Sequence, residues 1–133
     1  MKSLVTTLSF VGLSLLGSLG SVASAEVVFN DAAQTATHDC SADPVVSIES
    51  ASGTFTLTGT CTKVSINGAS NTVFITAAEK VAISGSSNEV TIEAADKIAV
   101  VGSMNKVLWK KGLKGPKAKV SNVGTMNKVS KIK

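Results

Sequence analysis

Four copies of one short motif recur in the second half of this 133-residue chain: Gly68-Ala69-Ser70-Asn71-Thr72-Val73, Gly85-Ser86-Ser87-Asn88-Glu89-Val90, Gly102-Ser103-Met104-Asn105-Lys106-Val107 and Gly124-Thr125-Met126-Asn127-Lys128-Val129. The first three copies follow one another at a constant interval, and the last begins later than that interval would place it. Repetition at a fixed period of this length indicates a solenoid, in which equivalent residues lie one above another.

A second motif precedes each of these copies and begins with lysine: Lys63-Val64-Ser65-Ile66, Lys80-Val81-Ala82-Ile83, Lys97-Ile98-Ala99-Val100 and Lys119-Val120-Ser121-Asn122. Both motifs alternate apolar with polar residues, which is the period of a β-strand with one buried face. One coil therefore has two strands, and its apolar face is buried only if coils stack. The sequence predicts an all-β fold, a short single-stranded parallel β-helix (β-solenoid) with about 17 residues per coil.

Two departures from the period are expected to be accommodated locally. Val46 and Ile48 precede Val64 and Ile66 by one position more than the period, so one residue has been added to the first regular coil. Five residues are added within 110–118, where glycines and a proline break the strand pattern. We expect this second addition to leave the stack as a loop.

Residues 1–25 resemble a secretory signal peptide rather than a part of the stack. Lys2 supplies a positive start, residues 4–16 are mainly apolar, and Ala23-Ser24-Ala25 is typical of a cleavage site. We expect a mature chain that begins near Glu26, is periplasmic or extracellular, and has no transmembrane span.

Cys40 and Cys61 both fall in the mature chain, and oxidising compartments favour a disulfide between them. Cys61 aligns with Ala78 and Ala95 of later repeats, while Cys40 lies about one coil earlier. The expected organisation is a signal peptide (1–25), an irregular N-terminal cap (26–44) that the disulfide attaches to the first coil, and a repeat domain (45–133).

Two columns of identical polar residues are expected along the stack. The asparagines of the Gly motif should hydrogen bond from coil to coil as a structural ladder, formed by Asn71, Asn88, Asn105 and Asn127. The lysines that begin the second motif should form an outward-facing column. Glu79 and Asp96 precede two of these lysines and can relieve their repulsion, while a flat array that binds a repetitive polymer is the alternative.

Charge is divided unevenly along the mature chain. Residues 26–102 contain nine carboxylates and three lysines, while residues 103–133 contain nine lysines and no carboxylate. This asymmetry suggests contact with an anionic envelope polymer or lipid surface, and the alternative is a solvated basic end that keeps the protein soluble. Nucleic acid is disfavoured because we expect the chain to be exported and because it lacks arginine and tyrosine. The candidate contact residues are Lys106, Lys110, Lys111, Lys114, Lys117, Lys119, Lys128 and Trp109.

Trp109 has two interpretations. It falls in register with Ile75 and Ile92, so the alternation places it inside, beneath the expected loop. A tryptophan exposed beside the lysines would instead stack on a sugar.

No constellation in the sequence points to catalysis. His38 is the single histidine and stands with Asp31, Asp39 and Asp43, but neither metal-ligand spacing nor a nucleophile motif accompanies it. We therefore expect no catalytic residue, no metal site and no cofactor.

A resemblance to a known family rests on three features. These are the run Thr56-Leu57-Thr58-Gly59-Thr60-Cys61, the repeated Gly-x-x-Asn-x-Val units, and Trp109 followed by Gly115-Pro116-Lys117. Together they resemble the bacterial secreted family DUF3060, a domain of unknown function, over roughly residues 46–129. The resemblance implies an exported protein of the bacterial envelope and no activity for any residue. Asn122 and Lys131 depart from the repeat at apolar positions, which suggests fraying of the last coil.

These features lead us to expect an exported non-enzymatic structural or binding protein of the bacterial envelope. Two alternatives remain open. One is a small carbohydrate-active protein like the polysaccharide lyases, which are larger parallel β-helices. The other is a structural unit that assembles with itself, and the sequence leaves its oligomeric state undetermined.

Overall fold

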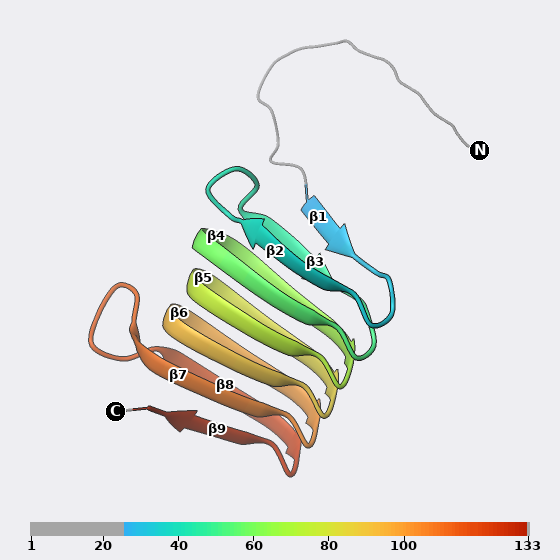
Figure 1. Ribbon diagram of the computed structural model, residues 1–133. Helices are drawn as coiled ribbons and strands as arrows, with labels where there is room; N and C mark the ends of the chain where they lie inside the picture. The colour runs from blue at the N-terminus through green and yellow to red at the C-terminus, as the bar shows by residue number, and fades with distance from the viewer. Residues whose placement is uncertain (1–25, 133) are drawn as a thin grey trace, which may run out of the picture.

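The computed structural model describes residues 26–132, so the predicted signal peptide lies outside the described residues. Within them the chain winds into a stack of parallel coils without helices (Figure 1). The predicted β-solenoid is confirmed. The strands are β1 (Glu26–Phe29), β2 (Thr35–Asp39), β3 (Val45–Ile48), β4 (Thr54–Ala69), β5 (Thr72–Ser86), β6 (Glu89–Ser103), β7 (Lys106–Gly112), β8 (Lys119–Thr125) and β9 (Lys128–Lys131).

The long strands β4, β5 and β6 each run through both strand segments of one coil and contain a complete lysine motif, while each Gly motif spans the turn to the following strand. Every neighbouring pair in the sheet is parallel, in the order β1-β3-β4-β5-β6-β7-β9, with β2 on β4 and β8 on β6. Equivalent residues of the repeat are paired, as in Thr72 with Glu89 and Lys80 with Lys97. Each position therefore meets its own counterpart one coil away, about 4.8 Å distant.

The core consists of the inward-facing apolar columns that the alternation predicts. Val64, Val81 and Ile98 are at most 1% exposed, and they pair in register along the stack. The outward residue Phe74, by contrast, is 47% exposed. Because a single coil has no second sheet to cover it, these columns are buried by the coils above and below.

The added residue of the first regular coil forms a bulge. Leu57 pairs with Ile75 and Thr60 pairs with Ala77, so the register between β4 and β5 shifts by one position between them. Gly59 lies inside the shift with φ of +74°, in the left-handed region that favours glycine. One bulge thus restores the period for the following coils.

Glycine is required at one corner of the regular coils, from Gly68 onward, because adjacent backbones approach closely there. Gly85 has φ of +124°, and a Cβ on it would lie 2.0 Å from the carbonyl oxygen of Gly68 in the preceding coil. No side chain fits at that distance. The same contact recurs between Gly102 and Gly85.

The asparagines beside this corner form a continuous ladder. Oδ1 of Asn88 accepts hydrogen bonds of 3.1 Å from both the backbone N–H and the side-chain amide of Asn71. The amide of Asn88 in turn donates to Asn105 Oδ1 and to the Gly68 carbonyl. Asn71, Asn88 and Asn105 are each 1% exposed, so the ladder satisfies polar groups that water cannot reach.

The five added residues near the C-terminus leave the stack as predicted. Gly112 pairs with Ala95 and Lys119 pairs with Lys97, so residues 113–118 form the loop between β7 and β8 (Figure 1). The backbone N–H of Leu113 still bonds the Ala95 carbonyl at 2.9 Å. The loop therefore starts and ends in register.

The segment 26–44 differs from the irregular cap that we expected. It contains β1 and β2, which pair in parallel with β3 and β4 and add a coil to the stack. The alternation is difficult to detect there because the inward side chains include Ala36 and His38, which are half-buried at the end of the stack. The repeat therefore begins at Glu26.

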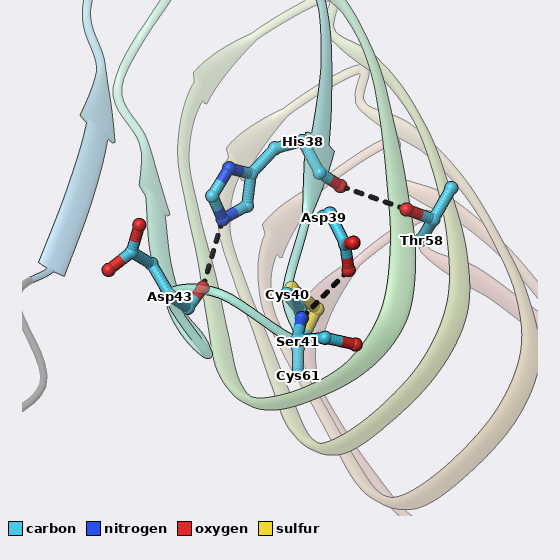
Figure 2. Close-up of a disulfide and its surroundings, with 7 residues drawn as sticks. All are labelled: His38, Asp39, Cys40, Ser41, Asp43, Thr58 and Cys61. Atoms are coloured by element: carbon cyan, nitrogen blue, oxygen red, sulfur yellow. Dashed lines mark hydrogen bonds between the residues drawn. A yellow bond between two sulfur atoms is a disulfide. The ribbon is translucent and has the colours of Figure 1, made fainter.

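The predicted disulfide joins this first coil to the next. Cys40 follows β2 and Cys61 lies in β4, with their Cα atoms 4.9 Å apart (Figure 2). Both residues are at most 1% exposed. In register, Cys61 is followed by Ala78 and Ala95, so the disulfide lies in the small-residue column at the bend of the coil.

The last coil is formed but uncovered. β8 and β9 pair with β6 and β7, although most of their residues are exposed. Asn122, at a position where earlier coils have isoleucine or valine, accepts a hydrogen bond of 3.2 Å from the Asn127 amide. Asn122 thus provides an acceptor for the last asparagine of the ladder within the same coil. The fraying expected for the last coil is not seen in its described residues, which form β8 and β9.

None of the described residues belongs to a helix long and apolar enough to span a membrane.

Removing the disulfide should lower stability without changing the fold. The two cysteines are 21 residues apart, and closing a loop of that size stabilises a protein by about 3 kcal/mol. We expect the double variant Cys40→Ala/Cys61→Ala to lose about that much free energy of unfolding in urea while keeping its circular dichroism spectrum. An unchanged free energy of unfolding would show that the first coil does not depend on the bond.

Breaking the middle of the ladder should cost more than breaking its end. Asn88→Ala removes the acceptor of the buried Asn71 backbone N–H and the side-chain donor to the Gly68 carbonyl, while the Asn71 side-chain amide keeps its bond to the Ser50 carbonyl. We expect a loss of about 3 kcal/mol in urea unfolding. Asn127→Ala is the matched control, with an expected loss of about 1 kcal/mol because Asn127 is half-buried and water can replace it. Equal losses would contradict this account of the ladder.

Candidate functional site

Four lysines from successive coils form one column on the outside of the solenoid. Lys63, Lys80 and Lys97 are paired in register across β4, β5 and β6, and Lys119 of β8 continues the column. All four are exposed. Since adjacent parallel strands lie about 4.8 Å apart, the column presents one ammonium group per coil over about 14 Å.

A groove runs beside this column because the next outward-facing residues are small. Ala82 and Ala99 lie two residues after Lys80 and Lys97, share their face, and leave room between the lysine stems and the strand surface. The groove has a volume of about 350 Å³ and a predominantly apolar lining. We call it the lysine groove, lined by Lys63, Lys80, Val81, Ala82, Lys97, Ile98, Ala99, Lys119, Val120 and Ser121.

In the described part of the chain, the lysines of the groove have no acidic partner. Among residues 26–132, no carboxylate oxygen lies within 4.0 Å of the ammonium groups of the column. Glu79, which was expected to relieve the column, instead pairs with Lys114 of the loop at 3.5 Å. Two like charges at the spacing of one coil repel each other by about 1 kcal/mol even in water, so the column retains an unrelieved positive field.

The other candidate lysines are distributed over separate surfaces. Lys106 and Lys128 are paired across β7 and β9 in the other row of strands, where Lys106 also lies 3.7 Å from Glu89. Lys114 and Lys117 are in the loop between β7 and β8. Of the lysines that the sequence suggested as contact residues, only Lys119 belongs to the lysine groove.

A second group of lysines lies at the open end of the stack. Lys110, Lys111 and Lys131 border a shallow hollow of about 630 Å³ beside Ile132. This hollow is open to solvent and lined by four residues, so fewer side chains could contact a ligand there than in the lysine groove.

Trp109 lies inside the solenoid rather than among the contact residues. It is 7% exposed and continues the inward column of Ile92. Lys131 covers it, with Nζ 5.6 Å from the ring centroid. The inward interpretation is therefore correct, and the sugar-stacking alternative is wrong because the indole face is covered.

The contacts of His38 stabilise the first coil. Its Nε2 lies 2.9 Å from the carbonyl oxygen of Asp43 (Figure 2). Its ring also packs edge-on with that of Phe29, with centroids 6.1 Å apart. The Asp39 carboxylate accepts from the backbone N–H of Ser41 at 2.9 Å. These contacts fix the turn that follows β2.

Groups that could hold a metal ion are not found in the described part of the chain, where no three residues among histidine, cysteine, aspartate and glutamate cluster together. His38 and Asp43 meet through a backbone carbonyl rather than through the carboxylate.

Sequence reasoning identified the lysine column but not the groove. The recurrence of lysine at one position per repeat was visible, and its outward direction followed from the alternation. The signal for the groove was the alanine two residues after Lys80 and Lys97, because a small side chain at an outward position leaves space. The sequence could not show that Glu79 pairs elsewhere.

Comparison with known proteins found one family. The model of the family described as "Protein of unknown function (DUF3060)" matches residues 48–92 and again residues 76–126. The two overlapping matches cover more than half of the chain, and their overlap reflects the internal repeat. No curated protein and no solved structure matched the chain.

Proposed function

The chain belongs to the DUF3060 family, whose description assigns no function, and from its geometry we propose that it is an exported, non-enzymatic binding protein of the bacterial envelope. Its ligand is a linear anionic polymer, which lies along the lysine groove. The observation that carries this proposal is the column of four lysines without acidic partners beside an apolar groove.

The column suits a ligand whose negative charges repeat. A polymer chain that runs parallel to the solenoid axis would meet a new ammonium group about every 4.8 Å. Lysine carries a compact charge on a flexible stem, so each side chain can adjust to a carboxylate or a phosphate. Bound anions would also remove the repulsion between neighbouring lysines.

The shape of the site favours a chain over a membrane surface. A lipid surface requires charges that project together from a flat or convex face, whereas these lysines border a concave groove of about 350 Å³. The alanine floor offers contact to the apolar parts of a polymer repeat. The other described lysines of the C-terminal part, which are exposed on other faces, add a long-range attraction for any polyanion.

Two features support export and the envelope. Residues 1–25 have the pattern of a signal peptide. The buried Cys40–Cys61 disulfide belongs to the kind of bond that persists in oxidising compartments.

A binding experiment with matched variants tests the groove. We expect the protein to bind polygalacturonate or polyphosphate at 20 mM salt and to lose most of this affinity at 500 mM, as measured by fluorescence anisotropy with labelled probes. Lys80→Gln/Lys97→Gln should weaken binding roughly tenfold, which corresponds to about 1.4 kcal/mol. Both lysines are exposed, so the fold should be unaffected.

The control variant is Lys117→Gln/Lys128→Gln. It removes the same net charge from outside the groove, at two exposed lysines without an acidic partner among the described residues. We expect less than roughly threefold weakening, because only the long-range attraction changes. Equal weakening by both variants would show that net charge and not the groove binds the polymer, and no binding at 20 mM salt would refute the proposal.

A further inference from the structure

Within residues 26–132, both ends of the stack present strand edges without a partner, and this feature is independent of the lysine groove. Among the described residues, β8 bonds only β6 and β9 bonds only β7 at the C-terminal end. At the opposite end, β1 bonds only β3 and β2 bonds only β4. Such edges carry free backbone N–H and C=O groups that can pair with another strand.

The core is open at the C-terminal end. Val120 continues the inward column of Val64, Val81 and Ile98, yet it is 42% exposed while they are at most 1% exposed. The missing element is a coil that would lie on top of it. At the first coil the inward residues Val27 and Ala36 are half-buried, whereas Val46 and Phe55, with which they pair, are fully buried.

The two ends carry opposite charges. Residues 26–62 contain five carboxylates and no lysine, namely Glu26, Asp31, Asp39, Asp43 and Glu49. Residues 103–132 contain eight lysines and no carboxylate. Contact between two like ends would be repulsive, whereas contact between unlike ends would be attractive.

If a second copy of the protein were added to the end of the stack in the same register, the strand pairing would predict which residues lie side by side. The column of Lys119 runs back through Lys97, Lys80, Lys63 and Val45 to Glu26. Glu26 of the next copy would therefore lie beside Lys119. By the same pairing Val27 would cover Val120, and Ala36 would cover Val129.

The asparagine ladder has complementary groups at its two ends. Each asparagine donates its backbone N–H to the asparagine of the next coil, but in the described residues the N–H of Asn127 has no such acceptor. In a continued stack its neighbour would be Gln34, which directly precedes β2. Oε1 of Gln34 is a buried acceptor without a hydrogen-bond partner. A change of side-chain rotamer would bring Oε1 of Gln34 within reach of the Asn127 backbone N–H.

We propose that the protein binds a second copy of itself head to tail, with β1 and β2 of one copy pairing in parallel with β8 and β9 of the next. The contact uses different surfaces on the two copies, so its repetition gives open filaments rather than closed dimers. Asn122 and Lys131 are polar at inward positions of the last coil, so this junction is weaker than an internal coil and forms reversibly.

Engineered cysteines test the register of this contact. Val28 and Ser121 belong to one outward column, so in the assembled form their Cα atoms would lie about 5 Å apart, which a disulfide can span. We expect Val28→Cys/Ser121→Cys to give a ladder of disulfide-linked multimers under mild oxidation. The protein is purified after export and its amino terminus is measured by mass spectrometry, because residues 1–25 directly precede β1.

The matched control is Val28→Cys/Val123→Cys. It moves one cysteine two residues along β8, which places the Cα atoms about 8 Å apart and out of reach of a disulfide. We expect it to remain largely monomeric on a non-reducing gel. Equal cross-linking of both variants would overturn the proposed register.

Light scattering of the unmodified protein provides a second measurement that no substitution can disturb. The mean mass should rise with protein concentration at 20 mM salt and fall toward the monomer at 500 mM, because the opposite charges at the junction are screened. Glu26→Lys should reduce the association by at least roughly fivefold, since it opposes Lys119 with a like charge. A monomer at millimolar concentration in low salt would refute the proposal while leaving polymer binding by the groove unaffected.

Discussion

The structure depends on one constraint, which is that every residue must tolerate its own counterpart one coil away. Parallel in-register stacking imposes this condition at a spacing of about 4.8 Å. Valine and isoleucine meet it by burying each other, and asparagine meets it because its amide is both a donor and an acceptor. Glycine meets it at the corner, where Gly85 approaches the carbonyl of Gly68 too closely for any side chain. The period, the core and the turns all follow from this condition.

Lysine is the repeated residue that gains no stabilising contact from its counterpart in the next coil. A lysine above a lysine gains nothing from the contact, and the ion pairs found among residues 26–132 lie elsewhere, at Glu89 and Glu79. The coil would stack as well with serine or threonine at these positions. A repeated side chain that stacking does not explain is therefore a better indicator of binding than the many repeated side chains that it does explain. By this criterion the asparagine ladder is explained by stacking, whereas the lysine groove is a candidate binding site.

The sequence was sufficient for the features that repeat and insufficient for those that occur once. The columns of the core, the asparagine ladder and the loop at 113–118 could be predicted because each is defined by its alignment with other coils. In 26–44, β2 was missed because its inward residues, Ala36 and His38, are small or polar. β1 was missed because its inward pair, Val27 and Phe29, is too short to show a period. The ion pair of Glu79 with Lys114 depends on the path of one loop, for which no second copy exists. The groove itself arises from the relative lengths of neighbouring side chains, which a pattern of polar and apolar positions does not contain.

The loop at 113–118 has a consequence for how this architecture can diversify. Gly112 enters it in register with Ala95 and Lys119 leaves it in register with Lys97, so the coil closes as if the five added residues were absent. Apart from Ala118, which packs against the core, its length and composition are therefore uncoupled from the packing of the interior. This corner is a natural graft point, at which a lineage can acquire new surface chemistry by insertion while the scaffold stays the same.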